Sequence, residues 1–381
     1  MGLETKVPVQ SRAQRLQSFK LADFAVPTGT EEEWRFTPLE RIADFFADTA
    51  AGAPLAVTVT GEAQYEQVSK DDARLGQILQ PDDRVSALAW EASETAHVVT
   101  IAQEAELSEE VVVDVRGGGE AAVSALQLLI DAKPFSKSTV IVNHSGNARV
   151  AESMEVVLGD SAQLTLVTVQ DWDDTSAHTL ANRIRVGRDA TLRHIVVSLG
   201  GDIVRVTTAV DYAGPGGDVN LLGAYFVDEN QHLEHRLLVD HNQPKCVSNA
   251  TYKGALQGEG AHSVWVGDVM IRANAEGTDT YELNRNLVLT EGAVADSVPN
   301  LEISTGEIEG AGHASATGRF DDEQLFYLKS RGIPEQEARR LVVRGFFAEL
   351  INQIGVESVQ NKLMEAIEAE LALTMGVGNG N

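Results

Sequence analysis

Cys246 is the only cysteine in the sequence and a candidate nucleophile. Lys245 precedes it, and a neighbouring ammonium group lowers the pKa of a thiol and so favours the reactive thiolate. A nucleophilic enzyme would pair the thiol with a base such as His241. A small, packed residue is the simpler interpretation of Cys246, and it is the one that we favour.

Three histidines lie shortly before this cysteine: His232, His235 and His241. They suggest a metal site at first sight, because a site built from histidine alone needs three converging imidazoles. In a strand, however, residues three apart point to opposite faces. The spacing therefore favours half-exposed strand histidines over a metal site.

His313 lies in the stretch GAGHASATG, residues 310–318, where small neighbours leave an imidazole accessible. It stands where a strand-rich region gives way to a helical one. From these residues alone, a structural histidine in a turn is the default interpretation.

Three consecutive glycines, residues 117–119, follow an apolar run, as a phosphate-binding loop would. A P-loop also needs a lysine on the phosphates, and the chain contains no Gly-Lys dipeptide. We therefore expect a turn at this point and no ATP bound in that mode. The residues that follow, up to 132, are rich in alanine and leucine and predict a short helix.

The composition excludes several classes of protein. The 381 residues include 30 Lys+Arg and 57 Asp+Glu, so the formal net charge is −27. Such a chain is repelled by nucleic-acid backbones and by anionic lipid. We therefore expect no nucleic-acid or membrane binding, and no signal peptide at the N-terminus. The sequence has no run of 18 apolar residues, so we expect no membrane-spanning helix. One cysteine can form no internal disulfide and cannot alone hold an iron–sulfur cluster, so the sequence predicts a cytoplasmic protein.

Three regions position these residues. Residues 1–95 are predicted to be an N-terminal helical region, with a capping box at Thr30 and Glu33 and an apolar helical face after it. Residues 96–318 consist of short runs with the alternation typical of strands. Residues 319–381 are predicted to be helical, with breaks at Gly332 and Gly355, and to end in a disordered tail.

A loose repeat opens several of the strand-like runs. It consists of a glycine, polar residues and a small apolar residue followed by Leu or Val, and it starts at Gly159, Gly187 and Gly217. A period of this length is typical of a solenoid, in which each turn buries its face against the next. We therefore predict a mainly β protein with a right-handed parallel β-helix core between helical ends. An antiparallel sandwich or jelly roll is the alternative. The polar stretch 170–181 does not follow the repeat and is expected to be an excursion from the core.

Several motifs resemble those of the SufB/SufD family of the SUF iron–sulfur cluster assembly system. The most specific is LFYLKSRGI at residues 325–333, preceded by NLEI at 300–303 and by the stretch around His313. EWRFT at 33–37 and DHN at 240–242 are also similar to family signatures. The resemblance extends over most of the chain and implies the same β-helix core.

The neighbours of His313 resemble the SufD type of the family. SufB-type chains carry a cysteine two residues before this histidine and a glutamate after it, whereas this chain has Ala311 and Ala314. The resemblance implies a non-catalytic scaffold that pairs with SufB and docks the ATPase SufC. The nucleotide is then bound by SufC, and a transient iron–sulfur cluster is shared with SufB through His313 as candidate ligand. Cys246 is a weaker candidate ligand.

The resemblance also implies that the C-terminal helices form the docking site for SufC, as they do in SufD-like proteins. The residues that we assign to it are Leu325, Phe326, Tyr327, Leu328 and Arg331, with the helix after Pro334. In isolation the chain could form a homodimer. Two other functions stay open: a SufB-like homodimeric cluster scaffold, and a β-helix carbohydrate-active enzyme that uses carboxylates such as Asp268 or Glu282.

Overall fold

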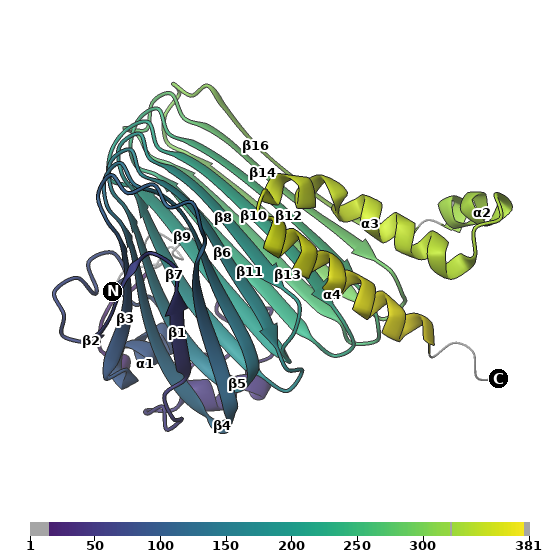
Figure 1. Cartoon of the computed structure of the whole chain (residues 1–381), viewed down its shortest axis with the longest axis horizontal. Coiled ribbons are helices and arrows are strands. Elements are labelled where there is room, and N and C mark those ends of the chain that lie inside the picture. Colours follow the sequence, from purple (N-terminus) through teal and green to yellow (C-terminus); the bar gives the residue numbers. More distant parts are fainter. Residues whose placement is uncertain (1–14, 321, 377–381) are drawn as a thin grey trace, which may run out of the picture.

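The computed structural model describes residues 15–320 and 322–376 and shows a parallel β-solenoid with three helices at its C-terminal end (Figure 1). The strands of the solenoid are β4 (Val111–Ala132), β5 (Lys137–Leu158), β6 (Gln163–Trp172), β7 (Ala177–Val186), β8 (Thr191–Ser198), β9 (Ile203–Tyr212), β10 (Asp218–Val227), β11 (His232–His241), β12 (Val247–Leu256), β13 (His262–Ile271), β14 (Asp279–Val288), β15 (Val294–Ile303) and β16 (Gly310–Arg319). The long strands β4 and β5 run through both walls of the solenoid, and from β6 onwards the even-numbered strands form one wall and the odd-numbered strands the other.

Every pair of neighbouring strands from β4 to β16 is parallel. Gln163 of β6 pairs with Thr191 of β8, one turn later, and Thr191 pairs with Asp218 of β10. This register confirms the predicted solenoid and excludes the antiparallel sandwich, since a sandwich would reverse the direction of neighbouring strands.

The glycine-led repeat marks corners of the solenoid. A Cβ atom on Gly187 would lie 2.6 Å from the carbonyl carbon of Gly159, so the corners stack too closely for a side chain. The third repeat is shifted along the strand relative to the first two. Because Asp218 pairs with Thr191, Gly217 falls level with Ala190 and not with Gly187. The repeat therefore predicted the period, while the strand register follows from the stacking of side chains.

Apolar side chains fill the inside of the solenoid. Along each strand, alternate residues point inwards, as the period of a strand requires. Leu164, Leu192 and Val219 form one such stack, in register and buried in three successive turns. Burial of this kind contributes on the order of 25 cal/mol per Å² of apolar surface.

Two predictions about the solenoid were wrong. Residues 117–132 belong to the long strand β4, which bulges between Gly118 and Val123, and are not a helix. Pairing with β5 on both sides of the bulge overrides the helix propensity of the alanine-rich segment. The polar stretch 170–181 is no excursion: it contains the end of β6, a short turn and the first half of β7.

The residues before the solenoid contain fewer helices than expected. They hold the 3-10 helices η2 (Leu21–Asp23) and η3 (Leu39–Phe46), one α-helix, α1 (Arg84–Ala92), and the strands β1 (Ala56–Thr60), β2 (Gln64–Ser69) and β3 (Thr95–Ile101). The helical face predicted after residue 38 is found in η3, where Ile42, Phe45 and Phe46 are buried.

The predicted capping box is absent. The carboxylate of Glu31, not of Glu33, accepts the backbone N–H groups of Thr28 and Gly29, and turns follow in place of a helix.

The C-terminal region contains α2 (Asp322–Ser330), α3 (Glu335–Ile354) and α4 (Glu357–Gly376). As predicted, the breaks between them lie at Gly332 and Gly355, which adopt φ angles of +85° and +66°. Figure 1 shows α3 and α4 against the outside of the wall that contains β10 and β12, while α2 projects away from the solenoid. The predicted disordered tail, residues 377–381, lies outside the described residues.

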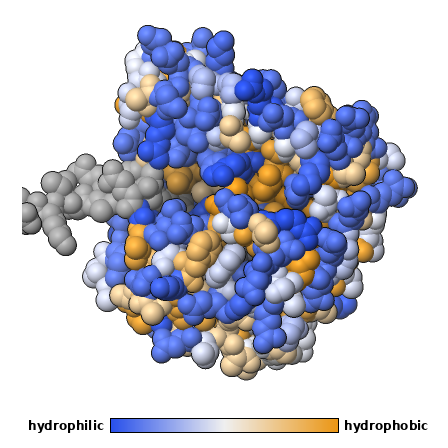
Figure 2. All heavy atoms as spheres, turned by 90° about the vertical axis from the view of Figure 1, so that its left-hand side faces the viewer, coloured by the Kyte–Doolittle hydropathy of each residue, from blue (hydrophilic) through white to orange (hydrophobic). Residues whose placement is uncertain are grey.

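No helix among the described residues is both long and apolar enough to cross a membrane. On the face shown in Figure 2, hydrophilic residues cover much of the surface and separate the hydrophobic ones from each other.

Candidate functional site

His313 lies on β16, the last strand of its wall, and no further strand of the described residues stacks upon it. Its side chain is exposed, and its small neighbours leave it accessible, as the sequence predicted. It belongs to a strand and not to a turn. Because β16 and β15 end the two walls, this end of the solenoid is open along two strand edges.

Polar side chains face the inside of the solenoid near this open end. Asn286 of β14 donates from Nδ2 to Ser297 Oγ on the opposite wall (3.1 Å) and to Thr317 Oγ1 of β16 (3.4 Å). Asn284, two residues earlier, donates to the Tyr225 hydroxyl (2.9 Å). These bonds link the last turns of the solenoid through a polar interior.

Glu282 of β14 is the register partner of His313. The side chain of Glu282 is 1% exposed, and neither of its carboxyl oxygens has a hydrogen-bond partner. Burial, aided by the negative charge of Asp268, raises the pKa of Glu282 to about 8. A polysaccharide cannot reach this carboxyl group, so the structure does not support its use in a carbohydrate-active enzyme.

Cys246 is a packed residue, in agreement with the interpretation that we favoured. It is fully buried, and burial raises the pKa of its thiol, so Lys245 does not produce a thiolate. The proposed base is occupied elsewhere: His241 Nε2 lies 2.9 Å from Ser248 Oγ. Among the described residues, Cys246 belongs to no group of three or more potential metal ligands.

The prediction of half-exposed histidines was wrong, because His232, His235 and His241 are all buried. His235 points into the solenoid, where its ring stacks on Tyr225 at a centroid distance of 5.0 Å. His232, on the opposite face of the same strand, lies 3.1 Å from Glu234. The sequence spacing correctly predicted that His232 and His235 point to opposite faces of their strand. Their burial was not predicted, because both faces of the wall are covered.

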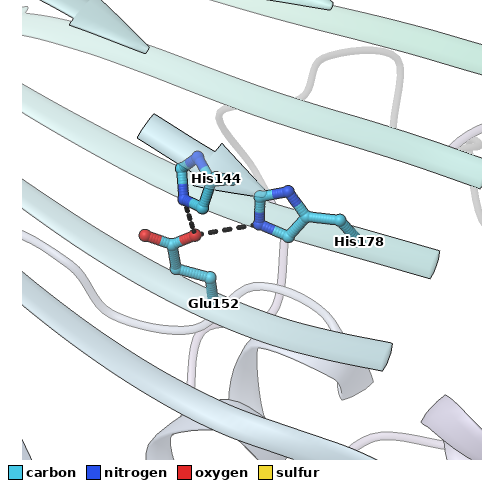
Figure 3. A group of neighbouring side chains, drawn as sticks. All are labelled: His144, Glu152 and His178. Carbon is cyan, nitrogen blue, oxygen red and sulfur yellow. Dashed lines mark hydrogen bonds and ion pairs between the residues drawn. The ribbon is translucent and has the colours of Figure 1, made fainter. Parts of the chain in front are cut away.

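A further buried group, His144, Glu152 and His178, was missed by the sequence reasoning (Figure 3). The ligand atoms of the three lie within 4.8 Å of one another. Glu152 Oε2 is 2.8 Å from Nε2 of each histidine. The three residues come from β5 and β7, and their spacing in the sequence contains no signal that could have identified them.

The hydrogen bonds of this group favour an ion pair over a metal site. His178 Nδ1 accepts the indole N–H of Trp172 (3.1 Å), so a neutral His178 carries its proton on Nε2, which donates to Glu152. A metal ion would have to displace that proton. His144 Nδ1 faces the carbonyl oxygen of Val169 (3.0 Å), and its Nε2 faces Glu152, so both of its ring nitrogens already have hydrogen-bond partners. The two histidines hold the pKa of Glu152 far below its usual range.

The EWRFT motif has a structural role. Glu33 pairs with Arg205 of β9, whose guanidinium lies 4.1 Å from the centroid of the Trp34 ring. Thr37 donates to Glu234 of β11 (2.7 Å). The motif thus anchors the N-terminal region to the outside of the solenoid.

The residues assigned to partner docking are only partly available. Leu325 is buried, whereas Phe326 and Tyr327 are 74% and 56% exposed. Leu328 is half-buried, and the exposed Arg331 donates to the Tyr327 hydroxyl (3.1 Å). Leu325 therefore packs against its own chain, and an exposed aromatic surface remains on α2.

Comparison with known proteins gives a consistent result. Residues 115–346 match the family described as "SUF system FeS cluster assembly, SufBD core domain". An iron–sulfur cluster assembly SufBD family protein of Mycobacterium tuberculosis is 51% identical over 373 residues, which cover 96% of this chain and 94% of the relative. The SufD proteins of Bacillus subtilis and Escherichia coli are 28% and 26% identical and cover 64% and 68% of this chain (57% and 58% of the relatives).

Proposed function

This chain belongs to the SufBD family of the SUF iron–sulfur cluster assembly system, and from that membership we propose that it is a SufD-type scaffold subunit. In this role it pairs with SufB, docks the ATPase SufC and helps to form the site of the nascent cluster in the cytoplasm. The observation that carries the proposal is the exposed His313 at the open end of the solenoid, without a thiol two residues before it.

The chemistry of this end explains why a second subunit is needed. An imidazole can ligate iron, but a cluster needs several ligands, and iron–sulfur clusters are held mainly by thiolates. Ala311 supplies no thiol, and Cys246 is buried among packed residues. A cysteine from SufB would complete the site, and the cluster is then cargo that is assembled and passed on.

The exposed aromatic side chains of α2 support the assignment of SufC docking. Phe326, Tyr327, Leu328 and Arg331 offer an apolar surface with one cation, a composition typical of interface hot spots. We propose that this chain catalyses no reaction itself and that ATP hydrolysis takes place in SufC.

The docking assignment is tested by replacing Phe326 and Tyr327 with Asp and measuring retention of SufC in a pull-down. The double variant should lose SufC and keep its fold, because both side chains are exposed. Val26→Asp is the matched control, since Val26 is also exposed, at 54%, but lies far away in the sequence. Unchanged retention of SufC by the double variant contradicts the assignment.

The cluster assignment is tested by co-expression with SufB and SufC, comparing wild type, His313→Ala and the control Ser315→Ala. Ser315 is exposed on the same strand. We expect His313→Ala to form the complex but to accumulate at least about tenfold less iron and sulfide. Equal accumulation in all three leaves this chain an architectural partner, and failure of the wild type to form a complex contradicts the SufD-type role. Cluster formation on the isolated chain would favour the homodimeric scaffold.

A further inference from the structure

The carboxyl group of Glu282 lacks any compensation inside the protein. It is 1% exposed, both of its oxygens are without a hydrogen-bond partner, and no ion pair is formed with it among the described residues. Burying such a group without a partner costs free energy, and buried carboxyl groups in proteins are protonated, paired, hydrogen-bonded or bound to metal ions. The position of Glu282 beside the open end indicates which of these applies.

We propose that Glu282 and His313 together bind a divalent transition-metal ion of the Fe²⁺ class, with Glu282 as the inner, carboxylate ligand. This inference rests on the proposed function, because it takes His313 as a ligand. It goes beyond that function by adding a second ligand from the same chain and by assigning the site to the metal ion alone, before a cluster exists.

The strand register brings the two residues together. Glu282 and His313 are paired in neighbouring parallel strands, so their side chains leave the wall on the same side, about 4.8 Å apart at the backbone. The pair four residues further along, Asn286 and Thr317, shows that side chains in this arrangement come into contact, at 3.4 Å. His313 is therefore the outermost member of the stack, with Glu282 directly behind it.

The opposite wall leaves space for the carboxyl group. A Cβ atom at Gly267 would lie 2.8 Å from Glu282 Oε2 and 2.4 Å from the Trp265 ring, so only glycine fits there. Trp265 Nε1 is also buried without a partner. The carboxyl group thus lies near the indole of Trp265 and the backbone at Gly267, one strand inside His313.

The ligand chemistry suits a divalent transition metal. Carboxylate oxygen and imidazole nitrogen both bind Fe²⁺, Zn²⁺ and Co²⁺, whereas Mg²⁺ prefers oxygen ligands alone. The carboxylate of Asp268 lies near enough to act on Glu282, and its charge also favours a cation. Two protein ligands leave the remaining coordination positions open, as the transfer of an ion to a growing cluster requires.

The test uses Co²⁺ as a spectroscopic probe on the isolated full chain, with anaerobic Fe²⁺ dialysis as confirmation. Wild type should bind one Co²⁺ with visible d–d absorption. Glu282→Gln and His313→Ala should each weaken binding at least about tenfold. Asp279→Asn is the matched control, because it removes one negative charge from the same strand but from an exposed position. It should bind as wild type does.

Folding of the variants is checked by circular dichroism and by thermal unfolding without metal. Glu282→Gln should be at least as stable as wild type, because an amide replaces an uncompensated acid. Glu282→Leu serves as a second variant: it should also fold and should bind no Co²⁺. Co²⁺ should raise the unfolding temperature of wild type but not that of Glu282→Gln or Glu282→Leu.

Two results overturn the inference: Co²⁺ binding by Glu282→Gln at wild-type affinity, or weak binding that all variants and the control share. The first leaves the proposed function intact if His313→Ala still reduces cluster accumulation in the complex. Conversely, a chain that binds Co²⁺ through both residues but forms no complex with SufB and SufC refutes the SufD-type role and not the metal site.

Discussion

Acid should destabilise this protein well above the pH at which carboxylates titrate, because its interior holds neutral histidines. Burial lowers the pKa of His194 to about 3 and that of His235 and His241 to about 4. The nearest charges, Glu234 for His235 and Asp240 for His241, act in the opposite direction but are weaker than burial. In each ring Nδ1 has no hydrogen-bond partner, so a second proton would find no acceptor.

The sign of the effect follows from the two states. In the unfolded chain these histidines titrate near pH 6.5, whereas in the folded chain they stay neutral to about pH 4. Between these limits unfolding takes up one proton per histidine, so the free energy of unfolding falls as the pH falls, by about 1.4 kcal/mol per pH unit for each. Glu282 acts in the opposite direction. Because its pKa is raised in the folded chain, unfolding releases one proton from Glu282 while the three histidines take up three. These four groups together contribute a slope of about 2.7 kcal/mol per pH unit.

The clearest test replaces His194 with Leu. His194 lies in register between Leu166 and Leu221, so leucine suits its surroundings. Urea unfolding followed by circular dichroism from pH 8 to pH 5 should show, below about pH 6.5, a slope smaller by about 1.4 kcal/mol per pH unit, a gain of about 2 kcal/mol by pH 5. The control is Leu192→Ala, two residues away on the same face, which should cost about 2–5 kcal/mol at every pH without changing the slope.

The reasoning is refuted if His194→Leu and wild type show the same slope. It is also refuted if Leu192→Ala changes the slope as much as His194→Leu does. In either case the interior histidines would be protonated in the folded protein, or hydrated enough to titrate normally.

Other substitutions test single contacts. Gly254→Ala should lower the free energy of unfolding by about 1–3 kcal/mol in urea titrations, because the new Cβ would lie 1.8 Å from the Tyr225 ring. The control Gly306→Ala, with open space around it, should have no effect. Equal stability of the two variants would contradict this packing. Glu152→Leu should cost about 3–5 kcal/mol at pH 7, because it leaves Nε2 of both His144 and His178 buried without the carboxylate partner, and a neutral result would contradict this role of Glu152. Lys253→Met should increase protease cleavage between the solenoid and α3, since Lys253 Nζ donates to the carbonyl oxygen of Phe346 (3.1 Å). Unchanged cleavage would show that the other contacts of α3, such as the bond from Arg193 to the carbonyl oxygen of Gln353, hold the helix without it.

Local rules were reliable where one residue decides the backbone. Gly332 and Gly355 end helices because they adopt positive φ angles, and their positions could be read from the sequence. The same rules failed where pairing partners decide: residues 117–132 favour a helix by composition, yet β5 and the strands around it bind them as β4. The capping box predicted for Thr30 and Glu33 failed in a similar way. Glu31 accepts the nearby backbone N–H groups instead, and the carboxylate of Glu33 pairs with Arg205 of the solenoid.

The sequence by itself favoured the solenoid over an antiparallel sandwich and predicted an accessible His313, because a repeat of glycine-led strands and a run of small residues are local patterns. Only the tertiary structure decided which polar side chains are buried. A strand period of two separates the faces of a wall but does not tell which face is enclosed by the coil or which is covered from outside. Glu282 and His235 look like ordinary strand residues in the sequence, and closure of the solenoid removes both from water.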